Sequence, residues 1–248
     1  MDVVLDRTPS GVPDVDNNVP PLLNSAELLL ASDFNELVAE VRQLQRRRVQ
    51  MVSIRRQRAL RIGPARLKTV LADAGLQVCT VGFAGGFTGT LGRSYRQAVD
   101  DARRALAFAA DLKARAVVVV PGDRGHHIYN HAERIVRDGI NDCIDDALRL
   151  RVDMLIPLTT VLGSGRDVFR PRCDSMLDWI EGFECHRVKT MMMLRRRSPL
   201  KGLPACWERC LRSGGALRIG RRCRTTIGSH NVIAEILTRL NNVAVPVA

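Results

Sequence analysis

The sequence predicts an α/β fold, a closed (β/α)8 barrel that lacks its final helix. Eight strand-like segments alternate with seven helix-like segments over 248 residues, which matches the size and element count of such a barrel. The alternation is clearest in residues 78–131, where two apolar runs, 78–83 and 116–121, flank one long amphipathic segment. That order predicts a parallel βαβ unit. An open doubly wound sheet would show the same alternation, so both architectures remain open.

Each predicted strand is a short apolar run, and residues 117–120 are an unbroken run of valines. Such a run is typical of a strand that is buried on both faces. The predicted strands are 22–30, 49–54, 76–83, 117–120, 152–158, 187–194, 215–219 and 243–247.

The predicted helices combine apolar residues at helical spacing with capping residues at their ends. Ser32 caps the first helix and Ser94 caps the third, while Pro64 opens the second and Gly75 closes it. The predicted helices are one from Ser32 through Leu44, then 64–74, 94–112, 131–150, 174 or 175 to 182, 204–212 and 229–240.

The first 21 residues differ in composition from the rest of the chain. Residues 6–21 are rich in Pro, Asp and Asn, a composition that does not favour a packed core. We therefore expect a flexible N-terminal leader over residues 1–21 and one barrel domain over residues 22–248. The acidic start carries no basic or apolar signal region, and no run approaches the roughly 18 apolar residues of a membrane helix.

The seven cysteines are irregularly spaced, which favours a reduced, cytoplasmic protein over a disulfide-bonded one. Cys206, Cys210, Cys223 and His230 could be drawn as a zinc site. Their spacing matches no zinc-finger pattern, so we favour incidental thiols and predict no metal site here.

The net charge of +12 is carried almost entirely by arginine, with clusters at 46–48, 55–58, 195–197 and 221–224. A basic chain can bind nucleic acid or phosphorylated ligands. Aromatic residues make up 4% of the sequence, which leaves little for bases to stack on. We therefore do not expect nucleic acid as a partner and favour a small anionic ligand.

Two loops that follow predicted strands carry the candidate site, because ligands gather at strand carboxyl ends in parallel α/β folds. His127 and His131 are the catalytic candidates, since imidazole can exchange protons near neutral pH. Glycines can let a ligand approach the backbone, and a helix N-terminus favours an anion. The predicted substrate-binding residues are Arg124, His126, Asn130, Gly85, Gly86 and Arg195.

The chain resembles the xylose isomerase-like TIM barrels, often called sugar phosphate isomerases or epimerases. The resemblance covers residues 49–158 and rests on AGGFTG at 84–89, the helix SYRQAVDDARRALAFAADLKA and the run VVVVPGDRGHHIYNHAERIVRD. It implies a TIM barrel and a divalent metal that holds a hydroxy-ketone sugar while a proton moves between adjacent carbons. Two Glu, one Asp and one His at later strand ends usually hold that metal in the family.

The later strands of this chain depart from the family pattern. Ile156-Pro157-Leu158 stands where Glu-Pro is expected, and Met191, Met192 and Met193 stand where an Asp is expected. Hard divalent ions prefer carboxylate oxygens. The resemblance thus predicts a metal cofactor for which these strand ends offer no ligands, and Asp167 is the one carboxylate in a suitable loop.

Three functions follow from the residues and the resemblance. The first is a sugar or sugar phosphate isomerase or epimerase, degenerate because the metal-binding carboxylates are missing. The second is a non-catalytic or regulatory barrel that binds a sugar phosphate or another anionic ligand through arginine. The third, less favoured, is a nucleic-acid-binding relative of endonuclease IV. A homo-oligomer is left open.

Overall fold

The computed structural model describes residues 27–157, 173–194, 209–210, 212 and 214–219. Seven parallel strands form one sheet whose spatial order is the order of the chain. They are β1 (Glu27–Leu28), β2 (Met51–Arg55), β3 (Gln77–Gly85), β4 (Ala116–Val120), β5 (Asp153–Pro157), β6 (Val188–Leu194) and β7 (Ala216–Ile219).

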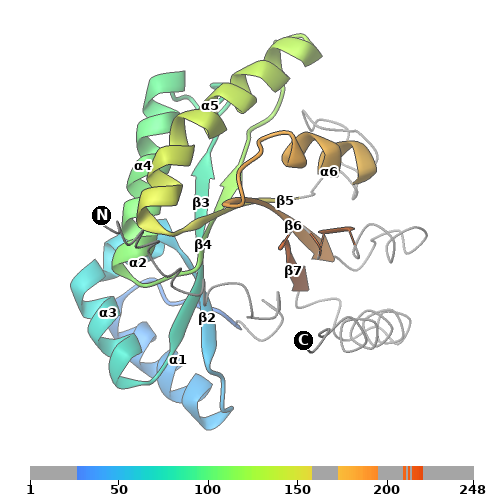
Figure 1. Cartoon of the computed structure of the whole chain (residues 1–248). Helices are drawn as coiled ribbons and strands as arrows, with labels where there is room; N and C mark the ends of the chain where they lie inside the picture. Colours follow the sequence, from blue (N-terminus) through green and yellow to red (C-terminus); the bar gives the residue numbers. More distant parts are fainter. Residues whose placement is uncertain (1–26, 158–172, 195–208, 211, 213, 220–248) are drawn as a thin grey trace, which may run out of the picture.

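In the described part of the chain, helices connect the successive strands from β1 to β6 and cover the outer face of the curved sheet (Figure 1). They are α1 (Phe34–Arg46), α2 (Arg56–Ile62), α3 (Pro64–Asp73), α4 (Tyr95–Asp111), α5 (Tyr129–Leu150) and α6 (Cys173–Glu181). A parallel sheet wound in one direction with its helices outside is the wall of a (β/α)8 barrel. The predicted fold class is therefore confirmed.

Alternate residues of each strand enter two different apolar layers. Val117 and Val119 of β4 pack against the helices in the main core, whereas Val118 packs inside the sheet with Leu155 and Met191. This burial on both faces confirms the interpretation of the valine run. Met191 and Met192 are also buried, as a strand-core role predicts.

The long helix α4 follows its predicted pattern closely. The Ser94 side chain accepts a hydrogen bond from the Gln97 backbone, and Gln97 accepts one from the Ser94 N–H, so the two form a capping box. The inward-facing residues are all buried, namely Ala98, Ala102, Ala105, Leu106 and Ala109. This packing fixes α4 against β3 and β4.

Several element ends differ from the predictions. Ser32 does not cap α1; the Asp33 carboxylate accepts the Glu36 N–H at 2.9 Å, and Ser32 instead donates to the Glu36 side chain. The seven-residue helix α2 was not predicted, because its arginine-rich sequence shows little apolar periodicity. Helix α5 begins two residues before His131, at Tyr129.

Strand β3 continues to Gly85, past the predicted end at residue 83, because Gly85 pairs with Val120 of β4. The predicted strand 22–30 is described as a strand over Glu27–Leu28. The leader at 1–21, the predicted helix 229–240, the strand 243–247 and the missing final helix lie outside the described residues, as does most of the predicted helix 204–212. None of the described helices is long and apolar enough to cross a membrane.

Candidate functional site

The loops that follow β3 and β4 dock onto each other at the carboxyl ends of the strands. We call residues 86–94 and 121–128 the paired loops. The Gly86 N–H donates to the Val120 carbonyl at 2.8 Å, and the Phe87 N–H donates to the Pro121 carbonyl at 3.0 Å. The Thr88 hydroxyl donates to the Asp123 carbonyl at 2.7 Å. These bonds make one rigid rim from two segments that are distant in sequence.

The glycines of the paired loops have a packing reason. Gly85 has a φ of +107°, and a Cβ there would lie 2.2 Å from the Val120 carbonyl oxygen. A Cβ on Gly86 would lie 2.7 Å from a methyl carbon of Leu91. A side chain at Gly85 would therefore clash with the end of β4, and one at Gly86 would require the Leu91 side chain of the same loop to move. That Gly85 and Gly86 also admit a ligand stays a prediction.

The two catalytic candidates lie together on the rim. The rings of His127 and His131 meet edge to face with centroids 5.1 Å apart. His127 Nε2 lies 3.2 Å from the Thr88 carbonyl oxygen, and His131 Nδ1 lies 3.0 Å from an Arg134 nitrogen. Both histidines are half-buried, and their catalytic role stays a prediction.

The other predicted binding residues lie around this pair. Arg124, His126 and Asn130 are exposed, and Asn130 belongs to the first turn of α5 rather than to the loop. Arg195 lies outside the described residues. Arg124 and His126 thus belong to the second of the paired loops and Asn130 to α5, next in sequence to the two histidines.

A cavity of about 170 Å³ lies inside the barrel mouth, at the carboxyl ends of β1, β2 and β3. Ser53 and Arg55 of β2 and Thr80 and Phe83 of β3 line it. The Thr80 hydroxyl donates to the Ser53 hydroxyl at 2.8 Å. Arg55 is exposed and Phe83 is 47% exposed. We call this the mouth cavity; no described histidine is among its lining residues.

The mouth cavity was not predicted from the sequence, although β2 carries a signal for it. In MVSIR, Val52 and Ile54 alternate with Ser53 and Arg55. Val52 and Ile54 belong to the main core beneath the helices. The strand period of two therefore turns the serine and the arginine to the opposite face.

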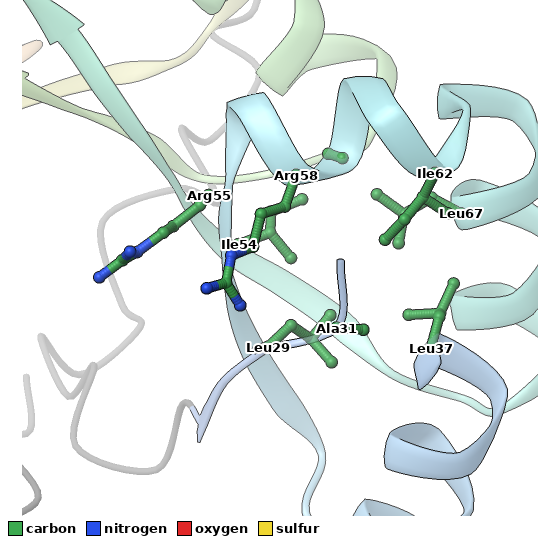
Figure 2. Close-up of a pocket in the computed structure, with 9 residues that line it drawn as sticks. Leu29, Ala31, Leu37, Ile54, Arg55, Arg58, Ile62 and Leu67 are labelled. Carbon is green, nitrogen blue, oxygen red and sulfur yellow. The ribbon is translucent and has the colours of Figure 1, made fainter. Parts of the chain in front are cut away.

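A second, much smaller space lies behind Arg55, on the helix side of β2 (Figure 2). Its volume is about 10 Å³, at the lower limit for a single water. The apolar side chains of Leu37, Ile62 and Leu67 wall it on one side. In Figure 2 the Arg55 side chain points away from them. The Arg58 side chain donates a hydrogen bond to the Leu30 carbonyl. This space is a packing gap and not a ligand site.

A buried ion cluster fixes α2 to the rim. Arg56, the first residue of α2, pairs with Asp101 of α4 at 2.5 Å, and Arg93 of the paired loops pairs with the same carboxylate oxygen at 2.7 Å. Burial alone would raise the pKa of Asp101, but the hydrogen bond and charge of Arg56, joined by Arg93, outweigh burial and lower it. Asp101 is therefore charged and holds Arg55, the neighbour of Arg56, in place.

The strand ends do not fit the divalent metal that the family pattern implies. Strand β5 ends in the buried apolar pair Ile156 and Pro157. Asp153 sits at the opposite end of β5, where it pairs with Arg187 at 3.0 Å and Lys189 at 2.8 Å. Within the described part of the chain, no group of three or more His, Cys, Asp or Glu side chains could hold a metal ion. Asp167 lies outside that part.

Among the cysteines whose side chains are described, Cys79, Cys143 and Cys185 form no disulfide. Cys210 is buried, with its sulfur 2.9 Å from the Thr190 hydroxyl. Burial raises the pKa of the Cys143 thiol to about 12, so this thiol is unreactive. The other members of the hypothetical zinc group, Cys206, Cys223 and His230, lie outside the described residues.

Solved structures of sugar epimerases share this fold. The chain is similar to a 3-keto-D-glucoside 4-epimerase from E. coli, with 13% identity, a TM-score of 0.73, and coverage of 90% of this chain and 89% of that chain. It is also similar to an L-ribulose 3-epimerase, with 14% identity, a TM-score of 0.70, and coverage of 90% and 77%.

A protein from Sinorhizobium meliloti 1021 matches with 18% identity and a TM-score of 0.62, over 88% of this chain and 98% of that chain. These low identities establish the fold and not the activity. No curated protein matches the chain in sequence. The family model for the xylose isomerase-like TIM barrel matches residues 35–192, more than half of the sequence. The chain belongs to the xylose isomerase-like TIM barrel family.

Proposed function

We propose that the barrel mouth binds a small carbohydrate that carries an anionic group, such as a sugar phosphate, without the divalent metal of its family. The observation that carries this proposal is the lining of the mouth cavity. It combines one cation, two hydroxyls and one aromatic ring. Binding sites for small polar molecules use such an apolar wall with a few directed polar groups.

Arg55 supplies the positive charge. Its side chain is exposed at the end of β2, and among the described residues no carboxylate pairs with it. A guanidinium offers a fork of N–H donors that matches phosphate and carboxylate oxygens. The neighbouring Arg56 is held by Asp101, so the backbone that carries Arg55 is anchored before a ligand arrives.

Ser53, Thr80 and Phe83 suit the carbohydrate part. The two hydroxyls bond each other at 2.8 Å, and each can still exchange hydrogen bonds with sugar hydroxyls. The exposed face of Phe83 can cover the apolar side of a sugar ring. The cavity of about 170 Å³ is open to solvent and has room for a small sugar at its mouth.

A sugar isomerase or epimerase reaction is the candidate activity for this site. Two of the solved structures that are similar to this chain are named as epimerases, one a 4-epimerase and one a 3-epimerase. In this proposal the proton-exchanging groups are His131 and His127, the two half-buried imidazoles that meet on the rim. They do not line the mouth cavity, so the reaction is a separate claim from the binding. The anionic ligand and the arginine together take over the positioning that a metal provides in the family.

The binding proposal is tested by thermal shift with D-fructose 6-phosphate, D-fructose and inorganic phosphate. We expect the melting temperature to rise most with the sugar phosphate. Arg55→Gln should remove most of that rise, because it deletes the charge in the cavity. Arg61→Gln, an exposed arginine at the last turn of α2, is the matched control and should behave like the parent.

Two outcomes would count against the binding proposal. One is an equal response to inorganic phosphate and to the sugar phosphate, which would leave the hydroxyls and Phe83 without a role. The other is an unchanged response in Arg55→Gln.

The activity is tested separately by deuterium exchange. In the parent protein, deuterium from the solvent should be incorporated into the sugar at the carbon next to the carbonyl. Incorporation at the same rate in His131→Ala would exclude that histidine.

The free thiols also support a reducing compartment for this function. Cys79 and Cys143 are buried and form no disulfide, and structural disulfides are rare in the cytoplasm. A cytoplasmic location is part of the proposal.

A further inference from the structure

A larger cavity lies at the opposite end of the barrel from the mouth. It has a volume of about 400 Å³ and opens between α3 and α4, where β2 and β3 begin. This volume falls in the range of small-molecule sites in proteins. We call it the basal cavity. In TIM barrels this end is associated with stability and not with catalysis, so a ligand here would be separate from the proposed sugar site.

Three cations surround the opening of the basal cavity. Lys68 comes from α3, and Lys113 and Arg115 come from the turn between α4 and β4. Lys68 pairs with Asp111 at 2.7 Å. Among the described residues, no carboxylate pairs with Lys113 or Arg115. The opening therefore has an excess of positive charge that no described side chain neutralises.

The interior of the basal cavity is apolar. Leu71, Leu76 and Leu112 are buried wall residues. At the floor the Cys79 sulfur lies 3.2 Å from the Met51 sulfur. Burial raises the pKa of the Cys79 thiol, while the charge of Arg115 acts in the opposite direction. Cys79 and Arg115 both line the cavity.

The backbone holds Lys113 in a defined position. It has a left-handed φ of +54°, and its N–H donates to the Ala110 carbonyl at 2.9 Å. This is the usual closing geometry at a helix C-terminus. The cation therefore projects from a fixed turn and not from a loose loop.

We propose that the basal cavity binds an organic anion with an aliphatic body, of the class of medium-chain carboxylates. The anionic group meets Lys113 and Arg115 at the opening, and the aliphatic chain replaces water against the leucines and sulfurs. Charge complementarity sets the sign of the ligand, and the apolar wall sets the nature of its body.

A competing explanation is that these cations only offset the carbonyl groups at the end of α4. Basic residues often lie at helix C-termini for that reason. That explanation predicts no preference for an anionic ligand, so binding measurements separate the two.

The test is calorimetric titration of the full chain with octanoate and with octane-1,2-diol, its neutral counterpart of equal chain length. We expect octanoate to bind more tightly than the diol. The double variant Lys113→Gln/Arg115→Gln should weaken octanoate binding about tenfold or more while the diol is unaffected. Ala72→Trp should abolish binding of both, because Ala72 is an exposed helix residue on the cavity wall and a large ring there fills the space.

Arg55→Gln is the matched control, since its charge belongs to the mouth cavity. It should leave octanoate binding unchanged, and Ala72→Trp should leave the sugar phosphate response of the mouth unchanged. Far-UV circular dichroism checks that each variant folds. The proposal is overturned if the diol binds as well as octanoate, if the double variant binds octanoate like the parent, or if octanoate does not bind.

Discussion

Asp101 is the residue on which the geometry of the rim depends most. Its side chain is 11% exposed. One carboxylate oxygen forms ion pairs with Arg56 and Arg93, and the other lies 3.8 Å from Arg104. Arg56 also donates to the Asp101 backbone carbonyl at 3.0 Å. The cluster joins α2, α4 and the paired loops. Because Arg55 precedes Arg56, loss of the cluster should also alter the position of Arg55 in the mouth cavity.

Asp101→Asn should destabilise the protein by about 3–5 kcal/mol, because it leaves the buried Arg56 charge without a counter-charge. Urea unfolding measures this change. Asp111→Asn is the control, since Asp111 forms an exposed pair with Lys68 and should cost about 1 kcal/mol or less. An equal loss in the two variants would contradict the role given to Asp101.

The same carboxylate makes a defined contribution to acid sensitivity. Its pKa in the folded protein lies below the usual 3.8. A group with a depressed folded pKa stabilises the protein above its unfolded pKa, and this stability is lost as the pH falls through the folded value. The stability difference between the parent and Asp101→Asn should therefore be constant near neutral pH and shrink below about pH 4.

Local spacing in a sequence indicates which side chains are neighbours, whereas the function of those side chains stays a prediction. His127 and His131 are four apart at the start of a helix, and they do meet. Arg55 was not predicted as a site residue, because its role depends on which face of β2 turns inward and on a cavity shared with β3. Histidines in a loop after a strand are recognisable as candidates from the sequence. An arginine on the inner face of a strand is not, because it looks like another member of the arginine cluster 55–58.

At the scale of elements, α5 packs against the paired loops where Gly139 meets the Phe87 ring. A Cβ on Gly139 of α5 would lie 2.5 Å from the Phe87 ring. Phe87 is 1% exposed and leads out of β3 into the rim. The ring therefore occupies the space that a side chain on this turn of α5 would need, which seats the loop on the helix.

Gly139→Ala should lower stability by about 1–3 kcal/mol through overpacking, although alanine favours helices by about 1 kcal/mol over glycine. Phe87→Leu alone should also be destabilising. The double variant Gly139→Ala/Phe87→Leu should be more stable than the sum of the two single losses predicts, because the smaller side chain makes room. Thermal unfolding of the four proteins measures the coupling, and simple additivity would contradict this contact.

Elements with strong periodicity were predicted well, and short charged ones were not. The capping box and the buried alanines identify α4 from sequence alone. Helix α2 escaped prediction because Arg56 is buried by its partner Asp101, a tertiary contact 45 positions away. The end of β3 was placed too early because its last residues gain their strand pairing from β4.

At the scale of the whole molecule, the barrel keeps the family architecture and changes the chemistry of its mouth. The described strand ends carry apolar residues where metal-binding carboxylates are expected, as at Ile156 and Pro157. Positive charge comes instead from Arg55, supported by the Asp101 cluster. The central claim is that this mouth binds an anionic sugar without a metal.

Calorimetric titration of D-fructose 6-phosphate into protein freed of metal with EDTA tests that claim most directly. If the mouth binds an anionic sugar without a metal, the metal-free protein should bind D-fructose 6-phosphate. Adding Mn²⁺ should change the affinity by less than about twofold, and Arg55→Gln should lower the affinity about tenfold. Absence of binding in EDTA followed by tight binding with Mn²⁺ would contradict it.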